Sequence, residues 1–268
     1  MLGFLCNLNL RSQSSFVATS SFRPPRAAGS NFAAIDARHG RVLLHSAPWT
    51  LGVNPLCNPF VIWDPITGDR TELPLLLRSI YPFSWNAAVL CASAGAGAAA
   101  CGHHGCSRGP FLVVFVRSER LLKYDLATRE VSVLPLPSEC FSTRVVPLTT
   151  EDGTLGCVHI VNTKLFLWSR EAAPDGNDVG WAQSRVIELE TLPPLHALSS
   201  PLDVAAFAHG AAVIIVRANG GIFTIDLNSC RVTKVCKDGS YSGIFPYLSF
   251  CTPALAAAST VEGPGANA

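Results

Sequence analysis

One short unit recurs along this chain and restricts what the chain can fold into. Each copy holds an apolar strand-length run, an aspartate, an apolar or proline residue, a hydroxyl residue at the turn and a second run. Because Asp, Ser and Thr side chains accept hydrogen bonds from the N–H groups of a turn, each copy is typical of a β-hairpin. The copies cover 60–73, 121–134 and 222–235, with aspartates at Asp64, Asp125 and Asp226 and hydroxyl residues at Thr67, Thr128 and Ser229.

The wider pattern predicts an all-β protein, and specifically a β-propeller of four-stranded antiparallel blades. A fourth, degenerate copy begins at Lys164, and a strand pair often precedes the hairpin, so each unit supplies about four strands. The residue before the turn falls at positions 63, 124, 168 and 225, and intervals of about 40–60 residues suit propeller blades. The 19 prolines and 21 glycines interrupt the chain too often for a helical protein. A β-sandwich with coincidental turns is the alternative.

The propeller is predicted to occupy residues 35–255. An irregular lead-in over 1–34 precedes it, and a disordered tail over 256–268 follows it. About 220 residues, at about 45 residues a blade, make about five blades. Two tryptophans that end strands, Trp63 and Trp168, are predicted to pack in the core rather than to form an aromatic patch for a partner.

A series of short motifs then follows a familiar order along the chain. They are IDARHGRVLL at 35–44, WDPITGD at 63–69, WNAAVL at 85–90, GPFLVVF at 109–115, TTEDG at 149–153, LWSR at 167–170, GW at 180–181, IFTIDL at 222–227 and PY at 246–247. Taken together, over roughly residues 22–255, they resemble the plant F-box-associated β-propellers, especially the large group in grasses.

This resemblance implies a non-catalytic module that presents a protein substrate, of unknown identity, to a cullin-type ubiquitin ligase. Members of the family usually carry an N-terminal F-box that binds the Skp adaptor, and residues 1–34 hold none of its hallmark pairs, so we expect no direct adaptor binding. The family also implies about one more blade of chain between Val116 and Leu121. We therefore expect strain, a gap or one incomplete blade near residues 90–125, as in a truncated gene product.

The composition bears on which partners the chain can take. Charged residues make up 15% of the chain and its net charge is +1, so there is no electrostatic case for nucleic acid or an anionic membrane. No apolar run is long enough for a membrane-spanning helix. We expect neither a nucleic-acid nor a membrane partner.

The ten cysteines are irregularly spaced, and several lie inside apolar runs, which favours reduced thiols in the cytoplasm or nucleus. Cys230 and Cys236 are predicted to be packed thiols on one face of a strand. The alternative location is a chloroplast or mitochondrion, because Asp36 is the first acid and the arginines and serines before it are typical of a transit peptide. There the chain would be a structural β protein.

One cluster has the chemistry of a metal site. Cys101, His103, His104 and Cys106 are ligands that zinc prefers. Four ligands so close in sequence do not easily surround a tetrahedral ion, and the segment is rich in Ala and Gly, so we favour an exposed loop.

The motifs of common enzyme families are missing from the sequence. It holds no nucleophile elbow, phosphate loop or dinucleotide fingerprint, so we expect no catalytic residue, no cofactor and no enzyme activity. His39, which precedes Gly40, is predicted to serve a turn rather than catalysis. The alternative is an enzyme built on a propeller scaffold.

Overall fold

A computed structural model gives the fold, and the regular secondary structure of its described part is almost entirely β-strand. Among the described residues, 19 strands form five antiparallel sheets. None of the described segments is a helix long and apolar enough to cross a membrane. The structure describes residues 3–8, 14–18, 32–46, 60–65, 67–74, 85–92, 110–117, 119–141, 143–150, 153–171, 180–195, 201–208, 211–237 and 241–247.

The repeated aspartates cap the hairpin turns, as the sequence predicts. In each of the three full copies the aspartate Oδ1 accepts a hydrogen bond from the N–H of the hydroxyl residue three positions later. The donor–acceptor distances are 3.2 Å at Asp64, 3.2 Å at Asp125 and 2.8 Å at Asp226. The next residue in each copy is left-handed, which turns the chain into the second strand: Gly68 (φ 81°), Arg129 (φ 60°) and Cys230 (φ 55°).

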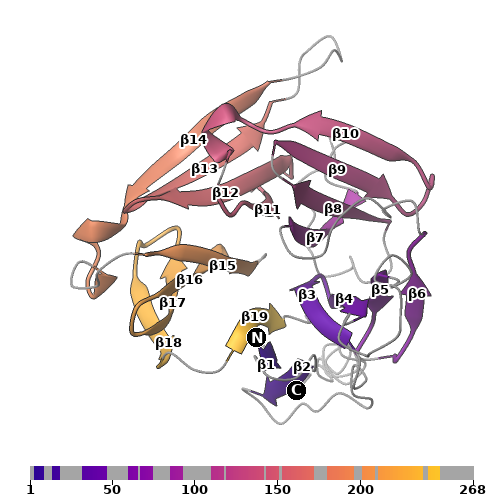
Figure 1. The fold of residues 1–268 in the computed structure, drawn as a ribbon, viewed down its shortest axis with the longest axis horizontal. Helices are drawn as coiled ribbons and strands as arrows, with labels where there is room; N and C mark the ends of the chain where they lie inside the picture. The colour runs from indigo at the N-terminus through magenta and orange to yellow at the C-terminus, as the bar shows by residue number, and fades with distance from the viewer. Residues whose placement is uncertain are drawn as a thin grey trace, which may run out of the picture.

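Four of the sheets are four-stranded blades that run in chain order from the axis outward (Figure 1). Blade 1 holds β3 (Phe32–Arg38), β4 (Arg41–Ser46), β5 (Phe60–Trp63) and β6 (Arg70–Glu72). Blade 2 holds β7 (Trp85–Cys91), β8 (Phe111–Arg117), β9 (Arg120–Asp125) and β10 (Val131–Pro135). Blade 3 holds β11 (Val146–Thr149), β12 (Leu155–Val161), β13 (Lys164–Arg170) and β14 (Trp181–Glu188). Blade 4 holds β15 (Asp203–Ala208), β16 (Val213–Ala218), β17 (Gly221–Asp226) and β18 (Val232–Cys236).

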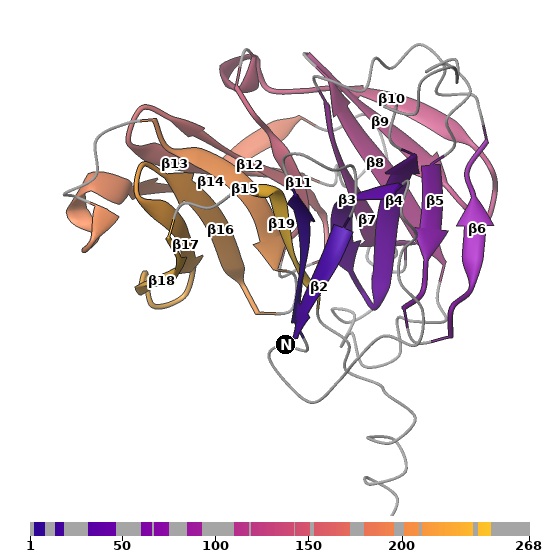
Figure 2. The same ribbon diagram turned by 60° about the horizontal axis from the view of Figure 1, so that its bottom comes forward.

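The two ends of the chain meet in a fifth blade, between blade 4 and blade 1 (Figures 1 and 2). It holds β19 (Tyr241–Tyr247) nearest the axis, then β1 (Gly3–Leu8), then β2 (Ser14–Ala18). The prediction of an irregular lead-in over 1–34 is therefore wrong where β1 and β2 form. The sequence did not predict β1 because this strand pairs with β19, from the other end of the chain, so no local signal marks it.

The inner strands β3, β7, β11, β15 and β19 contact one another in turn and close the ring. The prediction of about five blades, one of them incomplete, is confirmed. The position predicted for the incomplete blade is wrong. Around residues 90–125 blade 2 has all four strands, and β7 and β8 pair without a break from Trp85–Arg117 to Cys91–Phe111. The three-stranded sheet of the described residues is blade 5 instead.

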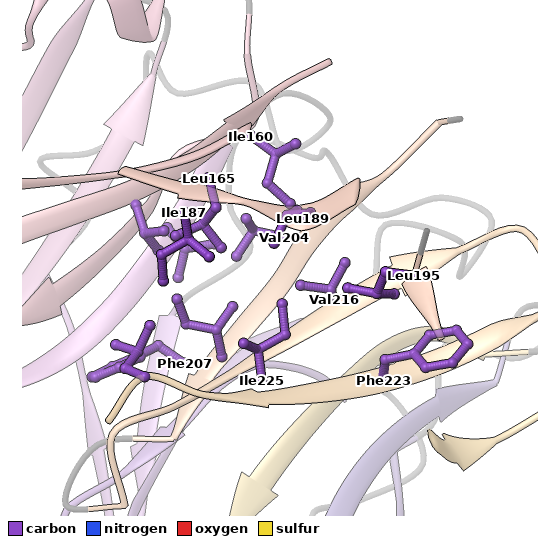
Figure 3. Packing of buried hydrophobic residues seen from close by; sticks show 14 of the residues in the cluster. Ile160, Leu165, Ile187, Leu189, Leu195, Val204, Phe207, Val216, Phe223 and Ile225 are labelled. Carbon is purple, nitrogen blue, oxygen red and sulfur yellow. The ribbon is translucent and has the colours of Figure 1, made fainter. Parts of the chain in front are cut away.

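The hydrophobic core lies between neighbouring blades rather than in one central mass. Between blades 3 and 4, Leu165 and Ile187 lie near Val204, and Leu195 lies near Phe223 (Figure 3). Such clusters hold blade to blade by apolar burial. Trp63 and Trp168 are both buried, at 1% and 7% exposed, and both belong to these clusters, which confirms their predicted packing role.

Candidate functional site

Two charged side chains are buried near the axis of the ring. Asp36 and Arg38 are two positions apart on β3, so they point to the same side of the strand. They are 3% and 2% exposed, and Arg38 Nε donates to Asp36 Oδ1 at 3.0 Å. A buried ion pair needs further hydrogen bonds to offset the loss of hydration.

Those further bonds come from other blades. The N–H of Val89, on β7, donates to Asp36 Oδ2 at 2.8 Å. Arg38 Nη1 donates to the carbonyl oxygen of Pro147, on β11, at 2.7 Å, and its guanidinium lies 5.6 Å from the ring centre of Phe207, on β15. Arg38 thus contacts blades 3 and 4, Asp36 contacts blade 2, and the pair ties four blades together at the axis.

Burial dominates the titration of this pair. It raises the pKa of the Asp36 carboxyl, while Arg38 and the N–H of Val89 act in the opposite direction. Burial also lowers the pKa of Arg38, opposed by Asp36. Both polar groups are used to join strands, which is a structural rather than a chemical task.

Sequence reasoning did not assign a role to this pair. The available signal was a pair of opposite charges at alternate positions of the otherwise apolar strand β3 (Phe32–Arg38). The pattern does not predict which backbone groups will form hydrogen bonds with the two side chains, because Val89 and Pro147 are far along the chain.

A second charged group lies where the inner strands β11 and β15 begin; we call this side of the ring the entry face. Arg144, just before β11, places Nη1 3.7 Å from Oδ2 of Asp203, the first residue of β15. Arg217 is directly opposite Asp203 in the β15–β16 register. The two side chains of the pair are 37% and 34% exposed.

Arg144 and Arg217 both act electrostatically on the carboxylate of Asp203. Burial raises the pKa of Asp203, and Arg144 and Arg217 both oppose that rise. Burial lowers the pKa of Arg144; Asp203 opposes this and Arg217 adds to it. The backbone next to Arg144 is fixed, since Asn86 Nδ2 donates to the carbonyl oxygen of Val145 at 2.7 Å.

The remaining sequence predictions have different outcomes. The metal candidates Cys101, His103, His104 and Cys106 lie outside the described residues, as does the tail over 256–268, so these stay predictions. His39 (φ 52°) lies with Gly40 in the β3–β4 turn, which confirms its turn role. No group of three or more His, Cys, Asp or Glu side chains able to hold a metal occurs within the described part of the chain.

The cysteines also need one correction. Cys230 does not lie on a strand with Cys236, because it occupies the left-handed turn position before β18. The described cysteines that are free thiols are Cys91, Cys140, Cys157, Cys230 and Cys236.

Comparison with known proteins assigns neither a family nor a function to this chain. No protein-family model matches the sequence. No curated protein matches it either. The resemblance to F-box-associated propellers therefore stays a prediction from the motifs quoted above.

Several solved structures are similar in fold. The extracellular domain of the one component system BT4673 from B. thetaiotaomicron is 10% identical, with a TM-score of 0.37, over 85% of this chain and 25% of that chain. The WD40 domain of SCAP from fission yeast is 10% identical, with a TM-score of 0.34, over 78% of this chain and 52% of that domain. The Cps50 (Swd1) β-propeller domain of Myceliophteria thermophila is 12% identical, with a TM-score of 0.30, over 82% of this chain and 62% of that domain.

This chain therefore spans about a quarter of the first of those structures and between half and two thirds of the other two. At such identities the similarity concerns the fold alone. The assignment of a propeller rests on the strand order and pairing within this chain.

Proposed function

We propose that this chain is a non-catalytic protein-interaction module that binds its partner on the entry face of the propeller. The observation that carries the proposal is the guanidinium of Arg144, which lies 3.7 Å from Asp203 at this face and belongs to a side chain that is 37% exposed. Arginine is favoured at the centre of protein interfaces because its planar guanidinium pairs with carboxylates in a fixed geometry. The matching partner segment is acidic.

The scaffold supports binding rather than movement. The Asp36–Arg38 pair joins four blades at the axis, and Asn86 joins blade 2 to the backbone beside Arg144. A rigid framework lowers the entropy lost when a surface group is ordered against a partner. Arg144 is held at its backbone and still exposes about a third of its side chain.

The finer proposal follows from the motif resemblance. The bound protein would be a substrate for a cullin-type ubiquitin ligase, and this chain would bind it without docking the Skp adaptor itself. A chain of this kind would compete for substrate as a bare binding domain.

The test is quantitative affinity capture followed by mass spectrometry, with the wild-type chain and the Arg144→Glu variant as baits. We expect at least one captured protein to be recovered about tenfold less with Arg144→Glu, the change that loss of about 1.4 kcal/mol produces. The matched control is Arg231→Glu, the same charge change at an exposed hairpin position of blade 4.

Two results would contradict the proposal. Captured proteins that bind Arg144→Glu and wild type equally would exclude the entry face as the binding surface. Direct, saturable binding of purified Skp adaptor to this chain would contradict the finer proposal. It would not affect the entry-face proposal, which the comparison of Arg144→Glu with wild type tests.

A further inference from the structure

Two cysteines meet in a buried polar group between blades 2 and 3. Cys140 ends a 3₁₀ turn, η5 (Ser138–Cys140), on the connection between these blades, and Cys157 lies on β12. Neither residue has any exposed surface. Both residues belong to one buried cluster between blades 2 and 3, and their side chains lie within hydrogen-bonding reach of each other.

A histidine and a tryptophan complete the group. His159 follows Cys157 by two positions on β12, and Trp168 is opposite Cys157 on β13. Trp168 Nε1–H donates to His159 Nε2 at 3.1 Å. Since indole nitrogen only donates, Nε2 accepts this bond. The other ring nitrogen, Nδ1, lies 3.1 Å from Thr143 Oγ1.

This arrangement makes the two thiols unequal. The hydrogen bond from Cys157 lowers the pKa of Cys140 to about 6, with a further lowering by His159, against the opposing effect of burial. The same hydrogen bond, together with burial, raises the pKa of Cys157. Cys140 is thus the better nucleophile and Cys157 holds its proton.

Cys140 is buried but lies at the edge of the structure. Its neighbours Ser138, Glu139 and Phe141 are all exposed. The backbone there is held by one short turn, in which Cys140 N–H donates to Pro137 O at 3.0 Å, and by Thr143 Oγ1, which donates to Cys140 O at 2.8 Å. Opening of such a short segment needs far less free energy than global unfolding and exposes the thiol.

We propose that Cys140 and Cys157 are a redox-active dithiol, which a low-molecular-weight disulfide converts to an intramolecular disulfide. The Cys140 thiolate attacks one sulfur of the reagent, R–S–S–R, and one R–S⁻ leaves. Cys157 then gives up its proton, and its sulfur attacks the Cys140 sulfur of this mixed disulfide and displaces the second R–S⁻. The two protein thiols are oxidised, the reagent is reduced, and the two protons lost from the protein go to the two released thiolates.

The product would bind the η5 turn covalently to β12, and so would lock blade 2 to blade 3. This role is independent of the proposed binding function, because the pair lies between the blades and Arg144 does not belong to it. Failure of one proposal leaves the other intact.

The test uses the full chain in its native state, treated with oxidised glutathione, then denatured, alkylated and digested with trypsin. Cleavage after Arg129, Arg144 and Lys164 places the two cysteines in separate peptides, 130–144 and 145–164. We expect these two peptides to be linked, with a mass lower than their sum by two hydrogen atoms. Recovery of both peptides in alkylated form, at glutathione concentrations that oxidise other thiols of the chain, would overturn the proposal.

Two variants test the order of attack. Cys157→Ser removes the second thiol, so we expect glutathione to remain attached to Cys140; attachment elsewhere with Cys140 left free would contradict the assignment. Cys230→Ser is the matched control, because Cys230 is only partly buried and lies in the turn before β18. In that variant the link between 130–144 and 145–164 should form as in wild type.

Discussion

Arg38 shows how one side chain can join parts of the ring that are far apart in sequence. Its guanidinium is buried, bonded to Asp36 and Pro147, and stacked near Phe207. A buried ion pair does not by itself make a fold more stable than an apolar pair would. Removing one member is different, because the other charge then stays buried without its partner.

For that reason we expect Arg38→Met to lower the free energy of unfolding by about 3–5 kcal/mol. Urea unfolding at neutral pH, followed by circular dichroism, measures the change. The double variant Arg38→Met with Asp36→Asn removes both charges, and it should be less destabilised than Arg38→Met alone. If the double variant is the weaker of the two, the buried charge of Asp36 is not the cause.

His45 offers a pH-dependent test on β4. Burial lowers its pKa to about 4, from an ordinary value of 6.5. As pH falls, the unfolded chain therefore takes up the proton first, so the His45 contribution to stability is present above about 6.5 and is lost on the way down to about 4. The loss is at most about 3 kcal/mol.

The measurement is the urea midpoint of wild type and of His45→Gln between pH 7 and pH 4. The difference between them cancels the other groups that titrate in this range. We expect wild type to lose more stability than the variant across this interval. Parallel curves would mean that His45 does not remain neutral in the folded chain.

The residues that sequence reasoning placed correctly are those with local partners. Asp125 accepts hydrogen bonds from residues two and three positions later, so the motif itself contains the contact. The role of Asp36 and Arg38 was not predicted, because their further hydrogen-bond partners come from other blades. The Cys101–Cys106 cluster lies outside the described residues, so its assignment stays a prediction.

Within single elements, the close approach of β11, β12 and β13 depends on one glycine. A Cβ on Gly156 would lie 2.7 Å from Leu148 Cδ1 and 2.8 Å from the carbonyl oxygen of Trp168. The second contact is with backbone, which cannot rotate away. The strand pairing of blade 3 therefore requires glycine at this position.

We expect Gly156→Ala to lower the free energy of unfolding by about 1–3 kcal/mol, because the added methyl forces neighbouring strands apart. Gly180→Ala is a control in the same blade, since a Cβ there meets nothing within 4 Å. Thermal unfolding of the two variants compares them directly. Equal destabilisation by both would show that the crowding at Gly156 is not what decides the result.

The elements predicted with success were the hairpins, where strand, turn and strand are contiguous. The strands β1 and β2 were missed for the opposite reason. β1 is paired with β2 on one edge and with β19 on the other, and β19 comes from the far end of the chain. An apolar run such as Gly3–Leu8 becomes a strand only when such partners are in place.

For the whole molecule, blade 5 is where the chain closes on itself. The inner strand β19 contacts both β15 and β3, so blade 5 connects blade 4 with blade 1. Circular closure protects the edges of the blades from other chains. The number of blades followed from the length of the repeat, whereas the position of the incomplete blade did not, because it depends on which strands pair across the termini.

Hydrogen–deuterium exchange, read by mass spectrometry, tests this closure most directly. We expect the amides of Gly3–Leu8 to exchange slowly in the intact chain, because β1 is hydrogen-bonded on both edges. Deletion of residues 1–18 should then speed exchange in Tyr241–Tyr247, while β12 and β13 stay protected. If Gly3–Leu8 exchanges as fast as an unstructured peptide in the intact chain, the ring is not closed by its two ends.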